Sequence, residues 1–134
     1  MGRRKTREHA FKLVYQIQIN NDDILEQMDQ YFKDNEVDVK EKQYIKDAVT
    51  YISENFVDID AVLSSFLAKT WRIERIPKVE LAIMRLAYYE IKHLDDVPKS
   101  VAINEAVELA KAYGSDDAGK YINAVLANIE DGEQ

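Results

Sequence analysis

The 134-residue sequence has no cysteine, only two prolines and four glycines, and no long run of apolar residues. The absence of cysteine excludes disulfides, thiolate nucleophiles and thiolate metal sites, and it fits a reducing compartment. No segment approaches the roughly 18 consecutive apolar residues of a membrane-spanning helix, and no apolar segment follows the N-terminal charges as in a signal peptide. We therefore expect a cytoplasmic protein that does not insert into a membrane.

The scarcity of proline and glycine leaves long uninterrupted stretches in which apolar residues recur at spacings of three and four. This spacing predicts an all-α fold of about seven helices, and the length suits one compact domain, residues 1–134. The segment WRIERIP, from Trp71 to Pro77, carries three charges and ends in a proline, so we interpret residues 71–76 as a linker between two halves, 1–70 and 77–130. The expected helices cover about residues 4–20, 23–34, 38–56, 58–71, 77–93, 98–113 and 115–129.

The fifth predicted helix, residues 77–93, is apolar on most of its circumference. Only Lys78, Arg85 and Lys92, at sevenfold spacing, form a narrow polar stripe along it. Because a helix that is apolar nearly all round needs neighbours on several sides, we expect it in the middle of a helical bundle.

Charge is distributed unevenly along the chain. The net charge is −7, but residues 1–12 carry +4 and the remaining 122 residues carry −11. If such a molecule binds a polyanion, the basic end must lead the approach, and its affinity should fall as salt rises. A solvated helix start is the alternative, although basic residues at a helix N-terminus oppose the helix dipole.

The first predicted helix adds aromatic rings to this charge. Arg4, Glu8, Phe11 and Tyr15 fall on one row at positions i, i+4, i+7 and i+11. Single-stranded RNA is bound by this combination, because guanidinium groups pair with phosphates and aromatic faces stack on unstacked bases. The alternative is that the rings widen the core face, which we favour for Phe11 and leave open for Tyr15.

Catalytic constellations are hard to find in the sequence. His9 and His93 lie in different predicted helices, and no nucleotide-binding, metalloprotease or serine-hydrolase motif occurs. The paired carboxylates of Asp95 and Asp96 fall where helix caps are needed. We therefore expect a binding protein and not an enzyme, with no metal and no cofactor.

Glu80 is an oddity of the fifth predicted helix. It projects onto a side shared with Met84, Ala87 and Ile91, where an unpaired carboxylate would be costly. Its place in the first turn after Pro77 offers one explanation, since the helix dipole favours an acid there. A basic side chain of a protein partner offers another, and the residues alone do not decide between the two.

Three segments together resemble the NusB family of bacterial transcription antitermination factors. They are RRKTRE with Tyr15 behind it, KVELAIMRLAYYEI, and VPKSVAINEAVELAKAYGSDDAGKYINAVL. The resemblance runs from Arg3 to Leu126, although residues 21–70 match only in pattern. It implies two stacked helical subdomains that bind boxA RNA together with NusE, a small-subunit ribosomal protein. The complex would load onto RNA polymerase and suppress termination, chiefly in ribosomal RNA operons.

The resemblance also implies site residues. Glu80 maps to the family's partner-facing glutamate. The RNA-binding positions map to Arg3, Arg4, Lys5, Arg7, Tyr15, Asp117, Lys120 and Tyr121. This chain departs from the family at Tyr113 and Tyr121, where phenylalanine is usual, and at Leu81, where a charged residue is common.

Two rival functions remain open on the sequence. One is a helical protein–protein scaffold or homodimer that does not bind RNA and whose basic end contacts only an acidic partner. The other is the RNA-binding part of a ribosomal RNA cytosine methyltransferase, which carries a similar domain, although the chain has neither a catalytic half nor a cysteine.

Overall fold

The computed structural model describes residues 3–130 and, within them, every side chain except that of Arg3. These residues form seven α-helices and one short 3-10 turn, with no strand among them, which confirms the predicted all-α fold. The elements are α1 Arg3–Ile19, α2 Ile24–Asp34, α3 Val39–Glu54, α4 Phe56–Ser65, η1 Ile73–Arg75, α5 Lys78–His93, α6 Lys99–Tyr113 and α7 Ala118–Ala127.

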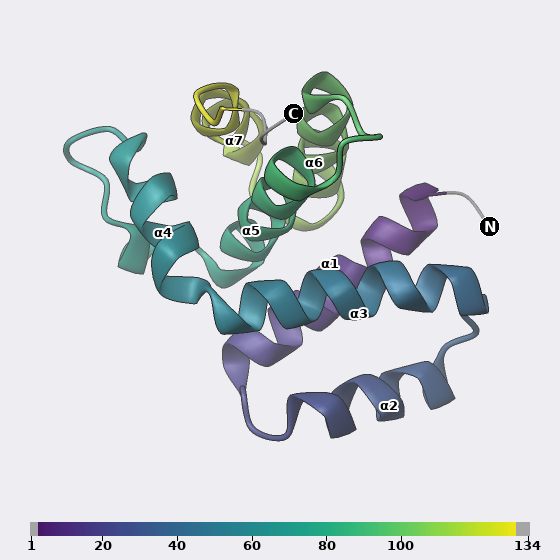
Figure 1. The fold of residues 1–134 in the computed structure, drawn as a ribbon. Helices are drawn as coiled ribbons and strands as arrows, with labels where there is room; N and C mark the ends of the chain where they lie inside the picture. Colours follow the sequence, from purple (N-terminus) through teal and green to yellow (C-terminus); the bar gives the residue numbers. More distant parts are fainter. Residues whose placement is uncertain (1–2, 131–134) are drawn as a thin grey trace.

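The helices are arranged largely in sequence order (Figure 1). Helices α1, α2 and α3 form one group, α5, α6 and α7 form another, and α4 lies at the side where the chain passes between them. Helix α5 packs against α1, α3 and α4 on one side and against α6 and α7 on the other. The division into two subdomains at residues 71–76 stays an interpretation, because α5 takes part in both groups.

Helix α5 is buried on all sides, as its largely apolar circumference predicts. Every residue from Glu80 to Ile91 is buried, so the helix occupies the centre of the bundle as its sequence predicts. Arg85, expected on a polar stripe, is also buried and donates hydrogen bonds to Asp60 in α4 (2.6 and 2.9 Å) and to Gln18 in α1 (2.8 Å). The exposed stripe was a wrong prediction at this position, because spacing within one helix does not show which acidic neighbour covers it.

Several helices begin at other residues than the ranges expected from the sequence. Helix α4 begins at Phe56, two residues before Asp58, and α7 begins at Ala118, three residues after Ser115. The backbone N–H of Ser115 donates to Glu80 in α5 (2.9 Å). Asp23 adopts the left-handed conformation (φ 49°) and makes no side-chain cap.

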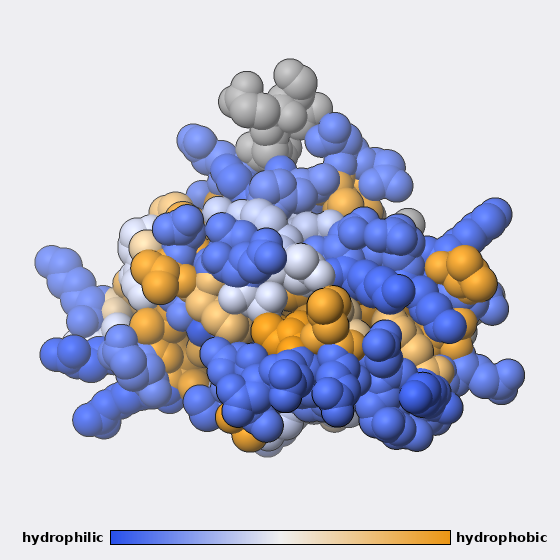
Figure 2. Space-filling view, turned by 60° about the horizontal axis from the view of Figure 1, so that its bottom comes forward, coloured by the Kyte–Doolittle hydropathy of each residue, from blue (hydrophilic) through white to orange (hydrophobic). Residues whose placement is uncertain are grey.

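The surface is largely polar. Figure 2 shows a face on which hydrophilic side chains surround a central band of apolar atoms. Between residues 3 and 130, no helix combines the length and the apolar character needed to cross a bilayer.

Candidate nucleic-acid interface

Helix α1 separates an apolar face from a charged one. Its buried face consists of Ala10, Leu13, Val14 and Ile17, all with no exposed surface. Phe11 is only 3% exposed, whereas Tyr15 is 37% exposed. The core interpretation is therefore confirmed for Phe11, and the ring of Tyr15 remains accessible to a ligand.

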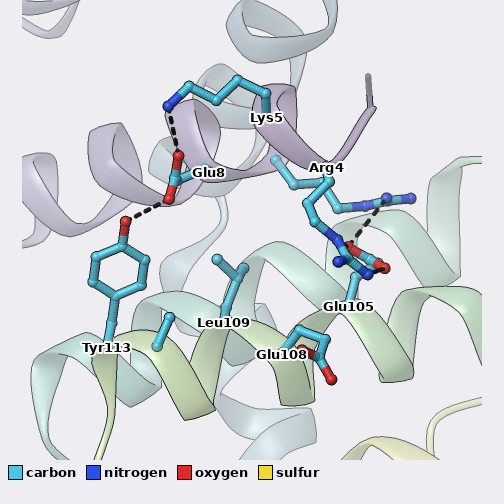
Figure 3. A pocket seen from close by; sticks show the side chains of 9 residues that line it. Arg4, Lys5, Glu8, Glu105, Glu108, Leu109 and Tyr113 are labelled. Atoms are coloured by element: carbon cyan, nitrogen blue, oxygen red, sulfur yellow. Dashed lines mark hydrogen bonds and ion pairs between the residues drawn. The ribbon is translucent and has the colours of Figure 1, made fainter. Parts of the chain in front are cut away.

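The basic start of α1 lines a cleft against α6. We call it the α1–α6 cleft; it measures about 540 Å³ and is lined by Arg4, Lys5, Arg7, Glu8, Glu105, Glu108, Leu109, Ala112 and Tyr113. Figure 3 shows Arg4 of α1 reaching Glu105 of α6 and Glu8 of α1 facing Tyr113 of α6, while Lys5 points to Glu8 on its own helix. The cleft is thus a place where cations, anions and an aromatic ring meet at the surface.

The exposed cations of the α1–α6 cleft are paired within the chain. Arg4 donates from Nε and Nη2 to both carboxylate oxygens of Glu105 (3.0 and 2.8 Å), and Lys5 donates to Glu8 (2.9 Å). The hydrogen bond from Arg4, followed by its charge, lowers the pKa of Glu105. Tyr113 donates to the second oxygen of Glu8, and this bond together with Lys5 lowers the pKa of Glu8. Both acids are therefore ionised around neutral pH.

Arg7 has a different environment from Arg4 and Lys5. It is 6% exposed, and its Nε lies 3.0 and 2.9 Å from the two carboxylate oxygens of Glu90, which also accepts from Tyr44. Burial opposes the charge, but the hydrogen bonds and charge of Glu90 outweigh it and raise the pKa of Arg7. The RNA contact expected of Arg7 stays a prediction; in the structure its guanidinium is bonded to Glu90 and lines the inner side of the α1–α6 cleft, 3.9 Å from Glu105. The side chain of Arg3 lies outside the described residues.

Glu80 is also enclosed within the chain. It is 3% exposed, and its two oxygens accept from the Tyr121 hydroxyl in α7 and from the Ser115 backbone N–H. The partner contact expected of Glu80 stays a prediction; in the structure both of its carboxylate oxygens accept hydrogen bonds from within the chain. Burial and the hydrogen bond to Glu80 raise the pKa of Tyr121 above its ordinary range. Glu80 fixes Tyr121 and the turn before α7.

The α7 residues suggested for RNA lie away from the basic start of α1. Asp117 and Tyr121 line a second cavity of about 360 Å³, which they share with the segment from Thr70 to Pro77. Lys120 is exposed on a separate hollow beside Lys111. The structure therefore places Arg4 and Lys5 at the α1–α6 cleft, Tyr15 farther along α1, and Asp117 and Tyr121 at a separate cavity beside α7.

Sequence reasoning missed four residues of these regions. Lys12 is exposed on α1, one heptad after Lys5, and its Nζ lies 5.9 Å from the centre of the Tyr113 ring. That heptad spacing could have revealed it. Trp71, Arg72 and Arg75 border the second cavity, but only the fold brings this linker beside α7.

The chemistry of both regions is that of binding. They offer guanidinium and ammonium groups, exposed rings and hydrogen-bonded carboxylates. Among residues 3–130, no group of three or more histidine or acidic side chains is placed to hold a metal ion. Phosphate pairing and base stacking use the groups that are present.

Comparisons with a family model and with known relatives both point to the NusB family. The model of the NusB family matches residues 4–131. Transcription antitermination protein NusB of Acetivibrio thermocellus is 44% identical over 129 residues, which cover 96% of this chain and 88% of the relative.

Solved structures agree with this match. NusB of T. maritima superposes with a TM-score of 0.83 at 34% identity, covering 95% of this chain and 89% of that one. A structure of the antitermination factors NusB and NusE in complex with dsRNA shares the fold with a TM-score of 0.81 at 24% identity, covering 95% of this chain and 96% of that one. This chain therefore belongs to the NusB family, whose named relatives are transcription antitermination proteins.

Proposed function

We propose that this antitermination factor binds boxA-type single-stranded RNA together with NusE, the small-subunit ribosomal protein. It would act within the RNA polymerase antitermination complex, in the cytoplasm, to suppress termination chiefly in ribosomal RNA operons. The family is one of transcription antitermination proteins and is not known as an enzyme family. We infer a binding role without catalysis and without a cofactor.

One observation carries the proposal: an exposed cationic and aromatic face on α1 in an otherwise acidic molecule. Arg4, Lys5, Lys12 and Tyr15 are exposed along this helix. Arg4 and Tyr15 are eleven residues apart, about 16 Å along the axis, so a strand could reach both. The body of the chain repels RNA, which leaves the basic face as the favourable approach.

Removing the two basic side chains at the start of α1 tests the site. We expect the double change Arg4→Ala and Lys5→Ala to weaken binding about tenfold at moderate salt, because two phosphate partners are lost. The slope of log affinity against log salt should become shallower by about one per lost contact. Fluorescence anisotropy of a labelled boxA strand, measured across a salt series, gives both quantities.

A matched control removes two charges elsewhere. Lys33 in α2 and Lys40 in α3 are both exposed and lie outside both candidate regions. Changing both to alanine alters the net charge equally and should leave most of the affinity. Equal losses of affinity from the α1 pair and the control pair would contradict the site.

Tyr15→Ala should weaken RNA binding with an unchanged salt slope, because its ring carries no charge.

The scaffold function remains the second candidate, favoured by the acidic body and by the internal pairing of Arg4 and Lys5. The RNA-binding function and the scaffold function are distinguished by titrating purified protein with boxA RNA alone and then in the presence of NusE. RNA binding that is absent in both titrations, while NusE itself binds, would favour the scaffold. A double-stranded RNA of the same sequence shows whether single strands are preferred.

A further inference from the structure

A buried histidine of α1 faces a tyrosine of α2. His9 is 5% exposed, and its Nδ1 lies 2.6 Å from the hydroxyl oxygen of Tyr31. The two rings meet edge to face, with their centres 5.5 Å apart and their planes inclined at 80°. The contact joins two helices through a titratable group that the proposed RNA-binding face does not use.

The second ring nitrogen of His9 has an unusual environment. Nε2 is buried and has no hydrogen-bond partner among residues 3–130. In the neutral imidazole this leaves one uncharged nitrogen unpaired, which costs less than leaving a charged group unpaired. Protonation places an N–H on both nitrogens, so the Nε2–H group would share a positive charge without an acceptor. The site therefore fits neutral His9 and disfavours its cation.

The charges on α1 add to this preference. Burial, followed by the charges of Lys5 and Lys12 about one turn away on either side, lowers the pKa of His9. Glu8 acts in the opposite direction, but its carboxylate is already bonded to Lys5 and to Tyr113 of α6. The neighbouring cations of the exposed face thus help to keep His9 neutral.

The groups on α2 and α3 do not reverse this balance. Burial raises the pKa of Tyr31 to about 12, so its hydroxyl stays neutral beside His9. Glu41 of α3 is already hydrogen-bonded to a threonine of α1 (2.7 Å). Lys42 and Lys46 of α3 lie over the aromatic ring that follows Tyr31 in α2, with their Nζ atoms 5.5 and 6.0 Å from its centre. Together these groups oppose a positive charge on His9.

Helix α2 is the element that the contact holds in place. It lies at the outer edge of the first group of helices (Figure 1), and Met28 is its one buried residue. Its other apolar side chains are partly buried or exposed, and an exposed hydrogen bond between Gln16 and Gln27 (2.9 Å) is a further link to α1. Elements with few buried contacts open locally at a lower free energy than the whole fold. Helix α2 can therefore leave α1 while the core around α5 persists.

We propose that the His9–Tyr31 contact is an acid-sensitive latch, which holds α2 against α1 while His9 is neutral and releases it when His9 is protonated. In the open form His9 reaches water and recovers the ordinary histidine pKa of about 6.5. The open form then binds more protons than the closed form, so a lower pH favours opening. The stabilisation of α2 is fully present above about pH 6.5 and is lost as the pH falls toward the lowered pKa of His9. The latch goes beyond the proposed function and does not depend on RNA binding.

Hydrogen exchange followed by mass spectrometry, between about pH 5 and pH 7.5, tests the latch on the full-length chain. Each rate is divided by the intrinsic rate at the same pH. Below about pH 6.5 the protection of residues 24–34 should fall by up to about tenfold per pH unit, because opening takes up one proton. Helix α5 should keep its protection over the same range. Protection of α2 that does not change with pH would overturn the inference.

His9→Gln should abolish the pH dependence, because an amide oxygen can accept from Tyr31 without titrating in this range. His93→Gln is the matched control, since His93 is also half-buried but lies in α5 against Tyr51 and Tyr89. It should leave the pH dependence of α2 unchanged. Dependence that persists in the His9 variant, or disappears in the His93 variant, would contradict the latch.

An NMR titration of the His9 imidazole in the unmodified protein decides the matter even where the glutamine variant does not fold. The expected midpoint lies below about pH 6.5, with the α2 amide signals shifting over the same range. A midpoint at or above the ordinary histidine value would overturn the latch. Neither measurement contains RNA, so its outcome leaves the proposed function to its own test.

Discussion

Single carboxylates control how available the basic side chains of α1 are. Glu105 holds Arg4 through two hydrogen bonds, the same bidentate geometry that a phosphate group offers to a guanidinium. Because Arg4 is exposed and Glu105 ionised, an RNA phosphate must compete with Glu105 for the same donors. Under the proposed function, Glu105 would therefore compete with RNA for the donors of Arg4.

Removal of this competitor should strengthen RNA binding. We expect Glu105→Gln to raise the affinity several-fold at low salt, because it frees Arg4 and removes one repelling charge about one Debye length or less from the bound strand. Anisotropy titrations of the boxA strand measure the gain.

Glu108→Gln is the matched control, since Glu108 lines the same cleft but is bonded to Lys111 (3.4 Å). It removes the same charge without releasing Arg4. An equal gain from both variants would show that general repulsion, and not competition for Arg4, limits the affinity.

At the scale of whole helices, a buried polar cluster joins α1 to α3 and α5. Arg7 of α1 and Tyr44 of α3 both bond to Glu90 of α5, which is 1% exposed. Removing one partner of such a pair leaves an uncompensated buried charge, which is more damaging than loss of a surface pair. The cluster fixes the direction in which α1 presents its outer face.

Arg7→Ala should therefore destabilise the fold. We expect the free energy of unfolding to fall by about 3–5 kcal/mol, because the carboxylate of Glu90 remains buried without its cation. Urea unfolding followed by circular dichroism measures the change.

Arg4→Ala serves as the comparison and should change the stability little, because its pair with Glu105 is at the surface. Under conditions where the Arg7 variant is still folded, its RNA affinity should be close to that of the parent. A loss of affinity as large as that of the Arg4 variant would mean that Arg7 does contact RNA.

For the whole molecule, α5 links the two groups of helices into one cooperative unit. Its buried residues contact helices on both sides, so neither group retains its core once α5 leaves. We expect a single equilibrium unfolding transition in urea, with coincident midpoints for Trp71 fluorescence at the linker and for circular dichroism over all helices.

The Arg7→Ala change should lower both midpoints together, although Arg7 lies in α1 and Trp71 in the linker. Two separated transitions, or a shift in only one of them, would show that residues 1–70 and 77–130 unfold as independent subdomains.

The sequence by itself determined the helical class, the buried faces of α1 and α5, and the contrast between a basic start and an acidic body. Side chains three and four apart share a helix face whatever the rest of the chain does, and formal charges add without reference to shape. Family membership was also accessible, because the α5 motif and the segment from α6 into α7 were specific enough to predict it.

Tertiary structure alone decided which charges face solvent. Arg4 and Arg7 are one turn apart, yet one is exposed and the other is bonded to Glu90 in a helix more than eighty residues away. The sequence offered two explanations for Glu80, the helix dipole and a protein partner. In the structure its carboxylate accepts hydrogen bonds from Tyr121 and Ser115, which reach it only after α7 folds back. Pairing between distant side chains depends on how helices pack, and local spacing carries no record of that packing.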